Sequence, residues 1–450
     1  MQVKAVILAA GQGTRMRSAL PKVIHPLLGQ PMLQYSVNAA YQVTGSKPVV
    51  VIGHGAEVIL QTFGEAADFV LQAPQLGTAH AVQQAEPAIR GQTDWVLVTY
   101  GDMPLLSTRT LSHLVQAQQA HNGPVTMLTL ISDDPRGFGR VVRDAQGRVL
   151  GVVEEAQATS EQLAIRELNA GVYCFAAEWL WDVLRRVPLS PKGEYYLTDV
   201  VGIAVKEGGS VQAHPLEDPL EAIGINTRVH LAEAEAFLRH RINQTWMLAG
   251  VTLIDPTHTY IEMGVMIGQD TVIFPNTYLQ GNTSVGEDCR LGPDTFVRNT
   301  QMGDRCKVFV SVLEGAVLED DVDIGPFGHL RKGAHLAKGV RMGNFGEVKS
   351  SYLGAGTKIG HFSYIGDATI GPDVNIGAGT ITCNFDGEKK NPTEIGAGVF
   401  VGSDTMLVAP VKLGEGARTG AGSVVTKDIP PYTLAVGVPA RAIRKLEKRD

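Results

Sequence analysis

A loop with two glycines and two basic residues follows the first apolar stretch of the chain. Residues 3–8 lead into Gly11 and Gly13, and then into Arg15 and Lys22. Glycines let a backbone approach a ligand closely, and main-chain N–H groups with basic side chains can hold a polyphosphate. The spacing matches neither a Walker loop nor the dinucleotide fingerprint. The pattern favours a phosphate-binding loop, and the alternative is a tight turn without a ligand.

A carboxylate stands just beyond another apolar stretch. Asp102 follows Gly101 after the apolar run of residues 95–99. A carboxylate at a strand end can hold Mg²⁺ together with substrate phosphates. An aspartate can also cap the start of a helix, because it accepts the free N–H groups there. The sequence leaves both interpretations open.

A histidine in the C-terminal half stands among polar residues. His361 lies two residues after Ile359, a predicted interior position, so we expect it outside the core near a corner. An imidazole titrates near neutral pH and suits a general base, although a single exposed histidine can equally be inert. Tyr364, Asn375 and Asn384 follow at distances close to one coil of the repeat fold or less, and we expect them to converge on one groove with His361.

Further features near His361 exceed what a scaffold needs. Arg331 and Lys349 precede the histidine and add positive charge. The repeat pattern is broken between Cys383 and Pro392 by a loop rich in Asn, Gly and Lys. Because insertions into repeat folds map to binding faces, this loop predicts a ligand site.

The fold that carries His361 is indicated by a period of six over residues 251–428. One series of aliphatic residues is Ile267, Ile273, Leu279, Val285, Leu291 and Val297. A period of six predicts hexapeptide coils of a parallel β-helix, in which three steps make one triangular coil around an aliphatic core. Glycine follows many of these residues, and we expect it to relax the backbone at the corners. Such a solenoid can be purely an oligomerisation rod, so its fold alone does not assign a function.

Strands and helices alternate in the N-terminal half. The apolar runs predict strands over residues 3–8, 48–53, 69–71 and 95–99, and helices over 31–43, 56–63 and 78–85. This alternation indicates a parallel sheet with helices on both faces, whose ligands bind beyond the carboxyl ends of the strands. The loops over residues 9–22, 72–78 and 100–104 are expected at that edge.

A long helix is predicted between the two halves. Residues 227–248 carry an apolar stripe at three- and four-residue steps, and Gly250 provides a stop. The stripe consists of Leu231, Ala234, Leu238, Ile242 and Trp246. We therefore predict domains over residues 1–226 and 251–450, joined by residues 227–250.

Composition argues against several classes of protein. The formal net charge of -7 argues against a nucleic-acid-binding chain. No segment approaches the roughly 20 apolar residues of a membrane span, which predicts no membrane partner. The four cysteines form no C-x-x-C pair, which predicts reduced thiols, a cytoplasmic protein and no structural zinc.

Several motifs together resemble a known family. They include Leu8-Ala9-Ala10-Gly11-Gln12-Gly13-Thr14-Arg15-Met16, Pro21-Lys22, Gln75-Leu76-Gly77-Thr78, Tyr100-Gly101-Asp102, Gly137-Phe138-Gly139-Arg140, Val153-Glu154-Glu155 and Asn169-Ala170-Gly171. With the hexapeptide tail, residues 3–436 resemble the bacterial bifunctional N-acetylglucosamine-1-phosphate uridylyltransferases and glucosamine-1-phosphate acetyltransferases. The resemblance implies an α/β chain with a Rossmann-like nucleotidyltransferase domain on a mostly parallel sheet, a long linker helix and a left-handed parallel β-helix.

The resemblance implies roles at the N-terminal site. The residues that would contact UTP are Leu8, Ala9, Ala10, Gly11, Gly13, Lys22, Gln72, Gly77, Thr78, Tyr100 and Gly101. Gly139, Glu154 and Asn169 would bind N-acetylglucosamine 1-phosphate. Asp102 and Asn226 would hold Mg²⁺, while Arg15 and Lys22 would neutralise charge at phosphorus. The sugar phosphate would attack the α-phosphorus of UTP and release pyrophosphate, so that positioning and charge neutralisation carry the reaction.

The resemblance also implies roles in the solenoid, with His361 as the base for glucosamine 1-phosphate. Arg331, Lys349, Tyr364 and Asn375 would bind the amino-sugar phosphate. Acetyl-CoA would lie along Ala378, Asn384, Phe385, Ser403 and Ala421. Arg441 would contact its phosphates, unless the basic C-terminal residues only form a solvated tail. The family's arrangement is a homotrimer with sites between subunits. The chain departs from the family at Ala79, Ala170, His329 and Phe385, where the family has Gly, Thr or Ser, Arg and Tyr.

Three functions compete at this point. The first is a two-step enzyme that acetylates glucosamine 1-phosphate and then couples the product to UTP. The second is a sugar-1-phosphate nucleotidyltransferase whose β-helix only trimerises it, and the third is a non-enzymatic regulatory subunit. Arg15, Lys22, Asp102 and Asn226 argue against the third. His361, its polar neighbours and the length of the solenoid argue against the second.

Overall fold

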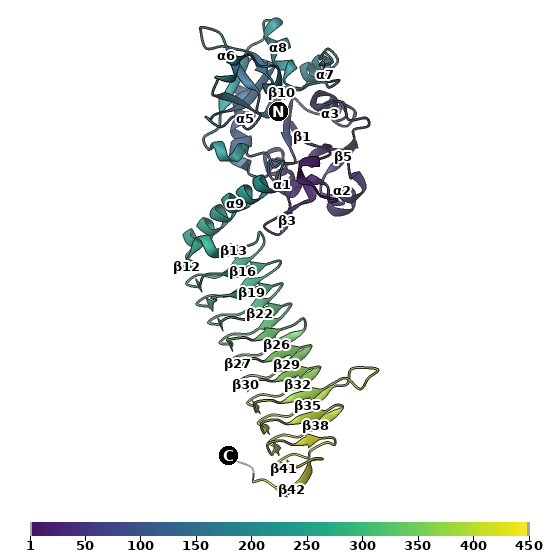
Figure 1. Ribbon diagram of the computed structural model, residues 1–450, viewed down its shortest axis with the longest axis vertical. Helices are drawn as coiled ribbons and strands as arrows, with labels where there is room; N and C mark the ends of the chain where they lie inside the picture. Colours follow the sequence, from purple (N-terminus) through teal and green to yellow (C-terminus); the bar gives the residue numbers. More distant parts are fainter. Residues whose placement is uncertain (1, 448–450) are drawn as a thin grey trace. The chain divides into compact units, whose positions relative to one another are not determined.

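The computed structural model contains two units, Met1–Phe237 and Leu238–Asp450 (Figure 1). It describes residues 2–447, so the first residue and the last three residues of the predicted domains lie outside the described residues.

The N-terminal unit is built on a nine-stranded sheet in which β8 and β9 lie beside the order β11-β7-β10-β6-β1-β4-β5. Its strands are β1 (Val3–Ala9), β4 (Val49–Ile52), β5 (Asp68–Leu71), β6 (Trp95–Tyr100), β7 (Val125–Ile131), β8 (Arg140–Arg143), β9 (Val149–Val153), β10 (Glu167–Ala176) and β11 (Val211–Pro215). The strands β6, β1, β4 and β5 are parallel, whereas β10 is antiparallel to β6 and β7. The predicted, mostly parallel sheet is confirmed. A short hairpin of β2 (Pro26–Leu27) and β3 (Gln30–Pro31) lies apart from it.

Helices cover both faces of this sheet, as predicted. They are α1 (Met32–Thr44), α2 (Ala56–Phe63), α3 (Thr78–Gln83), α4 (Glu86–Ile89), α5 (Thr108–Ala120), α6 (Ser160–Leu163), α7 (Ala177–Leu184) and α8 (Asp199–Lys206). Alternate residues of β1 face opposite sides, because side chains alternate along a strand. Val6 and Leu8 join a core with residues of α3, α7 and α8, while Ala5 and Ile7 join a core with residues of α1, α2 and α5.

The carboxyl ends of the central strands hold their loops together. The Gly101 N–H after β6 donates to the Leu8 carbonyl oxygen of β1 at 3.0 Å. The Gln75 side chain after β5 donates to the Ala10 carbonyl oxygen at 2.7 Å. These bonds bring the predicted loops to one edge of the sheet.

The predicted long helix is α9 (Arg228–Leu248). In the N-terminal unit Ala234 of its stripe is fully buried. In the C-terminal unit Ile242 and Trp246 pack against the solenoid core, and Asn243 donates to the Pro256 and Thr259 carbonyl oxygens. The predicted apolar stripe is therefore the packing side of the helix in each unit.

The C-terminal unit is a solenoid with three parallel faces, which appear as stacked rungs in Figure 1. The first face contains β12 (Thr252–Leu253), β15 (Val272–Ile273), β18 (Arg290–Leu291), β21 (Lys307–Val308), β24 (Asp323–Ile324), β27 (Arg341–Asn344), β30 (Lys358–His361), β33 (Asn375–Ile376), β36 (Phe400–Val401), β39 (Arg418–Thr419), β41 (Thr433–Val436) and the antiparallel β42 (Arg441–Lys445). The second face contains β13 (Thr259–Ile261), β16 (Thr277–Gln280), β19 (Thr295–Arg298), β22 (Val312–Glu314), β25 (His329–Leu330), β28 (Glu347–Lys349), β31 (Tyr364–Gly366), β34 (Ile381–Cys383), β37 (Met406–Val408) and β40 (Val424–Val425). The third face contains β14 (Met266–Ile267), β17 (Ser284–Val285), β20 (Gln301–Met302), β23 (Val317–Leu318), β26 (Ala334–Leu336), β29 (Ser351–Leu353), β32 (Ala368–Ile370), β35 (Thr393–Ile395) and β38 (Val411–Leu413).

The aliphatic series of period six fills the interior, as predicted. Ile273, Leu279, Leu291 and Val297 are fully buried, and the cluster they belong to runs through the coils from Val251 to Ala435. Each coil contributes one strand to each face, so its inward residues stack on those of the next coil.

The predicted role of the glycines after these residues is wrong at most positions. Gly292 and Gly325 have positive φ, at 95° and 108°, but Gly268, Gly286 and Gly343 do not. Their constraint is close packing instead. A Cβ at Gly268 would lie 2.6 Å from the backbone of Gly286 in the next coil, and one at Gly343 would lie 2.0 Å from the Gly360 carbonyl oxygen.

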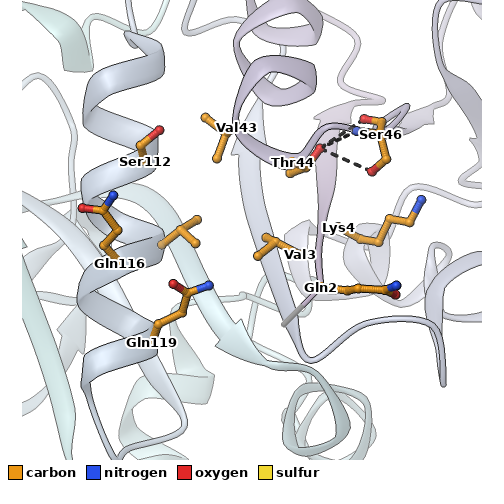
Figure 2. A pocket seen from close by; sticks show the side chains of 10 residues that line it. Gln2, Val3, Lys4, Val43, Thr44, Ser46, Ser112, Gln116 and Gln119 are labelled. Carbon is orange, nitrogen blue, oxygen red and sulfur yellow. Dashed lines mark hydrogen bonds between the residues drawn. The ribbon is translucent and has the colours of Figure 1, made fainter.

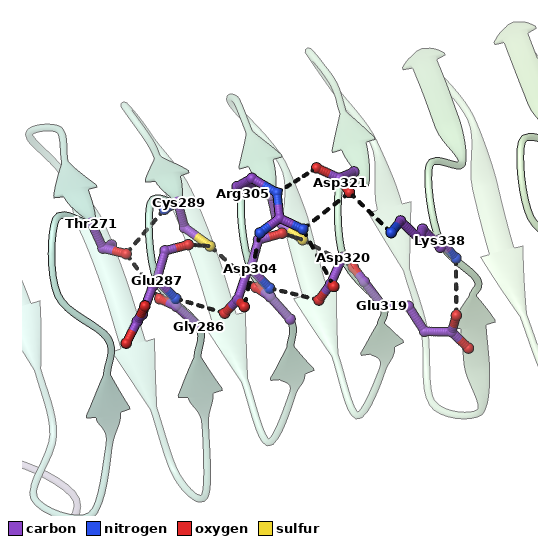
Figure 3. A network of polar contacts seen from close by, with 12 residues as sticks. Thr271, Gly286, Glu287, Cys289, Asp304, Arg305, Glu319, Asp320, Asp321 and Lys338 are labelled. Atoms are coloured by element: carbon purple, nitrogen blue, oxygen red, sulfur yellow. Dashed lines mark hydrogen bonds and ion pairs between the residues drawn. The ribbon is translucent and has the colours of Figure 1, made fainter.

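Polar side chains fasten successive corners to one another (Figure 3). The Asp304 carboxylate accepts the Glu287 N–H at 2.9 Å, and the Asp320 carboxylate accepts the Asp304 N–H at 3.0 Å. Arg305 pairs with Asp321 at 2.7 Å. This ladder satisfies main-chain donors that the turns leave unpaired, and it holds the coils in register.

Candidate functional site

A cavity of about 520 Å³ opens beyond the carboxyl ends of β1, β5 and β6. Nine of the residues predicted for the nucleotide line it, together with Asp102, which was predicted for Mg²⁺; the nine are Leu8, Ala9, Ala10, Gly11, Lys22, Gln72, Gly77, Thr78 and Tyr100. Gln72 is buried, and its amide donates to the Gly77 carbonyl oxygen at 2.9 Å. The sheet thus brings together loops that are far apart in sequence.

Two predicted glycines shape this cavity without lining it. Gly13 has a φ of 62°, and a Cβ there would meet the Cβ of Lys22 at 2.6 Å. A Cβ at Gly101 would meet Leu33 at 2.8 Å. Both positions bring backbone close to a neighbouring group where a larger residue does not fit.

A second cavity of about 430 Å³ adjoins the first. It contains the residues predicted for the sugar, Gly139, Glu154 and Asn169, together with Arg15 and Asn226. Thr78, Tyr100, Asp102 and Tyr196 line both cavities. The residues predicted for the nucleotide and for the sugar therefore meet at a shared wall.

A small cluster of opposite charges lies at that wall. The Lys22 ammonium contacts the Asp102 carboxylate and donates to the Asn226 side-chain oxygen at 3.1 Å. The Lys22 and Asp102 side chains are only 12% and 18% exposed. Asp102 does not cap α5, because Ser107 is the N-cap and accepts the Thr110 N–H. A carboxylate and an amide oxygen that converge on a cation are a donor set that suits Mg²⁺.

Two residues without a predicted role form hydrogen bonds with residues that were predicted to bind the sugar. The Asn169 amide donates to the Tyr173 hydroxyl at 2.7 Å, and the Thr198 hydroxyl donates to Glu154 at 2.8 Å. Burial, followed by the negative charges of Asp102 and Glu154, raises the pKa of Tyr100, so its hydroxyl stays protonated. No sequence spacing links Tyr173 to Asn169 in this way, because a shift in the register of β10 separates them.

His361 is exposed at the corner between the first and second faces of the solenoid, as the period of six predicted. The residues stacked beyond it in successive coils are Ala378, Ser403 and Ala421. The register is fixed by main-chain bonds: the Gly379 N–H donates to His361, the Asp404 N–H to Ala378, and the Gly422 N–H to Ser403. Three residues predicted for acetyl-CoA thus form one line with the predicted base.

The other predicted residues of the amino-sugar site mostly lie on the second face or at its far edge. Arg331 pairs with Glu347 at 2.8 Å, and Lys349 ends β28 one coil later. The Asn384 amide lies 3.4 Å from the Tyr364 hydroxyl, and Asn384 is buried. Asn375 points outward on the first face, beside Lys358 and Phe400.

These two groups are separated within a single chain. His361 precedes the strand β31, whereas Lys349 ends a strand of the same face and Arg331 and Asn384 follow two others. At about 3.3 Å per residue, the two edges of the face are roughly 15 Å apart. A small substrate can therefore contact both groups only if a second copy of the chain supplies one of them.

One side chain that the sequence analysis missed touches His361. The Asn344 side-chain oxygen contacts the Nδ1 atom of His361, and the two residues pair between β27 and β30. Their separation of 17 residues, which is one coil, could have identified the pair.

The loop between β34 and β35 leaves the stack of coils (Figure 1). Asp386 closes this loop. The Asp386 carboxylate accepts the N–H groups of Glu388 and Lys389 at 2.9 and 2.8 Å, and the Asn391 amide at 2.8 Å. The same loop places the Lys390 ammonium 5.0 Å from the centre of the Phe385 ring, which is 56% exposed.

Asp386→Ala is expected to lower kcat/KM for acetyl transfer by roughly 10-fold, because the loop would no longer hold Phe385 beside the site. The main-chain N–H groups of Lys389 and Glu388 lower the pKa of Asp386 to about 2. Because this folded-state value lies below the ordinary 3.8, the carboxylate orders the loop fully above that ordinary value and loses this effect as the pH falls through about 2. Steady-state kinetics at pH 5–8 should therefore show no titration of this group.

The matched control is Asp294→Ala, which removes a corner aspartate paired with Asn276 in an early coil. It should leave acetyl transfer unchanged. An unaltered kcat/KM in Asp386→Ala, or an equal loss of uridylyl transfer, would contradict the role of the loop.

A further cavity lies at the other end of the central strands of the N-terminal sheet, where β1 begins. Figure 2 shows it between the start of β1, the end of α1 and α5, and its volume is about 510 Å³. It contains none of the predicted residues. Among residues 2–447, no cluster of three or more His, Cys, Asp or Glu side chains could bind a metal, and no helix is long and apolar enough to cross a membrane.

Known protein families and individual known proteins are similar to both units of the chain. The model of the MobA-like NTP transferase domain matches residues 5–178, and that of the bacterial transferase hexapeptide (six repeats) matches residues 392–427. The bifunctional protein GlmU of Heliobacterium modesticaldum is 48% identical over 433 residues, which are 96% of this chain and 94% of that protein. The bifunctional protein GlmU of Trichlorobacter lovleyi is 46% identical over 453 residues, covering 99% and 98% of the two chains.

Proposed function

The chain belongs to the family of bifunctional GlmU proteins, and from this premise we propose which residues carry each of its two reactions. It is a bifunctional enzyme that makes UDP-N-acetylglucosamine. It transfers the acetyl group of acetyl-CoA to glucosamine 1-phosphate and then the uridylyl group of UTP to N-acetylglucosamine 1-phosphate. We assign uridylyl transfer to residues 1–226 and acetyl transfer to residues 251–450, with residues 227–250 as the linker.

The uridylyl site lies at the wall shared by the two N-terminal cavities. UTP occupies the cavity of Gly11, Gln72 and Gly77, and the sugar phosphate occupies the cavity of Glu154 and Asn169. An oxygen of the sugar phosphate attacks the α-phosphorus of UTP, the new P–O bond forms, and pyrophosphate leaves. The chain supplies orientation and positive charge and forms no covalent bond to the substrates.

We propose that Asp102 and Asn226 hold Mg²⁺ at this site. Support comes from their contacts with the Lys22 ammonium, which mark the point where a cation is stabilised. When bound, Mg²⁺ neutralises phosphate charge and orients the triphosphate. Lys22 would neutralise the triphosphate, and Arg15 in the sugar cavity would neutralise the attacking phosphate.

The acetyl site is supported by one observation above all, the line formed by His361, Ala378, Ser403 and Ala421 in successive coils. Acetyl-CoA lies along this line, with Asn384 and Phe385 of a neighbouring copy beside it and Arg441 near its phosphates. His361 takes a proton from the ammonium of glucosamine 1-phosphate, and the free amine attacks the thioester carbonyl. A C–N bond forms and the C–S bond breaks; the second proton that the nitrogen loses passes to the leaving sulfur, so CoA leaves as its thiol.

We propose that the chain forms a homotrimer through the second face of the solenoid. In its early and late coils this face presents apolar residues, which include Tyr278, Phe296, Val312, Met406 and Val408. The first face instead presents charged residues such as Arg290, Lys307, Arg341 and Lys358. Exposed apolar patches of this kind favour contact with another copy.

Assembly through this face would also complete the acetyl site. His361 lies at one edge of the second face and Arg331 with Lys349 at the other, so a cyclic contact brings unlike edges of two copies together. The cations of one copy then bind the phosphate of the sugar whose amine faces His361 of the next. The four free cysteines of the chain further support a reducing compartment, and we propose the cytoplasm.

The proposal is tested by mixing the purified protein with glucosamine 1-phosphate and acetyl-CoA, without UTP, and by following the release of CoA thiol. Release that depends on the amino sugar supports an acetyltransferase site in the solenoid. Absence of release, with uridylyl transfer from N-acetylglucosamine 1-phosphate intact, would favour the alternative of a nucleotidyltransferase with a non-catalytic β-helix. Sedimentation analysis of the same sample tests the trimer.

A further inference from the structure

We propose that Asn344 is a positioning residue that fixes the tautomer and orientation of His361 for acetyl transfer. The proposal rests on the proposed function of His361 as the base. Asn344 itself does not touch the substrate in this scheme and acts only through the imidazole ring.

The backbone of His361 is already held by its neighbours in the solenoid. Its carbonyl oxygen accepts the Gly379 N–H at 3.1 Å and the Ser363 hydroxyl at 3.0 Å. The Phe362 N–H donates to the Asn344 carbonyl oxygen at 3.1 Å. These bonds fix where the side chain of His361 begins, but they leave the ring free to rotate.

Asn344 restricts that rotation. Within residues 2–447, its side chain is the one that bonds the His361 ring, through a contact between the amide oxygen and Nδ1. Asn344 is the last residue of β27 and His361 the last residue of β30, and the two are direct partners in the parallel ladder. The contact is therefore built into the register of the coils and does not depend on a mobile loop.

The chemistry of the contact selects one tautomer. An amide oxygen only accepts hydrogen bonds, so Nδ1 must carry the proton. The Nε2 atom then keeps its lone pair and is the atom that can remove a proton from the ammonium of the sugar. After the transfer Nδ1–H still donates to Asn344, so the contact persists in both states of the ring.

Among the residues that the structure describes, none forms an ion pair with the His361 ring that could take over this role. The residues that precede the two partners in their strands are Gly343 and Gly360. The charged residues of these strands are Arg341 and Lys358 at their far ends, and Glu347 in the next strand is paired with Arg331. A neutral amide beside the ring therefore orients it without adding a charge.

The test compares Asn344→Ala, Asn344→Asp and His361→Ala in separate assays of acetyl and uridylyl transfer. In Asn344→Ala, kcat for acetyl transfer should fall roughly 10- to 100-fold with little change in KM, because the ring loses its orientation. In Asn344→Asp, the new carboxylate should favour the protonated ring and move the acid limb of the pH–rate profile up by roughly one pH unit. Uridylyl transfer should match the wild type in both variants.

Two controls exclude a merely structural effect. Asn299→Ala removes an asparagine whose side chain bonds the Asn282 N–H at another corner, and it should leave both activities unchanged. In protein labelled at histidine Cε1, the NMR titration midpoint of His361 should move in Asn344→Asp, while that of His335, which lies 2.9 Å from Glu319, should stay.

The outcomes separate the inference from the proposed function. Wild-type kcat and pH profile in both Asn344 variants, with acetyl transfer abolished in His361→Ala, would overturn the positioning role alone. Acetyl transfer retained in His361→Ala would overturn the proposed base, and the inference with it. Should Asn344→Ala fail to fold, Asn344→Asp decides through its pH profile, since it keeps the size and an acceptor oxygen.

Discussion

His361→Ala is expected to abolish acetyl transfer and to leave uridylyl transfer at the wild-type rate. Without a base, the amine of glucosamine 1-phosphate stays largely protonated and cannot attack the thioester, so the loss should be about 10²- to 10⁴-fold. The described residues that line the N-terminal cavities all belong to the N-terminal unit, so the second activity provides an internal measure of folding. The two rates are measured separately, by the release of CoA thiol and of pyrophosphate.

The matched control for this variant is His335→Ala. His335 is another histidine of the solenoid, and its ring is paired with Glu319 on the third face, away from the line of Ala378 and Ser403. This substitution should leave both reactions unchanged. A joint loss of the two activities in His361→Ala would refute the model of two independent sites.

Asp102→Ala is expected to remove uridylyl transfer alone. The carboxylate is the one negatively charged group that contacts Lys22 among the described residues, and with Asn226 it forms the proposed Mg²⁺ site. Loss of this site should reduce the rate by roughly 10³-fold, because charge neutralisation at phosphorus carries the reaction. Acetyl transfer should be unaffected. Binding of Mn²⁺, followed by electron paramagnetic resonance, provides a measurement that does not depend on turnover.

Asp94→Ala is a suitable control for the Asp102 variant. Asp94 is an aspartate next to the same strand, but it precedes β6 at its amino end, where its carboxylate accepts the Gln2 N–H at 2.8 Å. The Asp94→Ala variant should bind Mn²⁺ and transfer uridylyl groups as the wild type does. Retained uridylyl transfer in Asp102→Ala, at saturating Mg²⁺, would refute the metal role of that carboxylate.

The local patterns of the sequence were sufficient for most of the fold. The alternation of apolar runs and helical stretches predicted β1, β4, β5 and β6 with the helices between them, because each signal lies within a few consecutive residues. The antiparallel strand β10 was not predicted, since nothing local marks the direction in which a strand joins a sheet. The glycines of the solenoid were predicted in the right place but for the wrong reason, because the packing partner of Gly268 lies in another coil.

The sequence by itself determined the coils, the buried aliphatic core and the exposure of His361, because a period of six specifies which residues point inward. The tertiary structure alone decided which residues stand beside that histidine. Ala378, Ser403 and Ala421 follow it at intervals of 17, 25 and 18 residues, so no constant spacing reveals that they form one line. The inserted loop after β34 lengthens one coil without moving the next out of register. Alignment across coils is fixed by the hydrogen bonds between parallel strands, and these join residues that no local pattern connects.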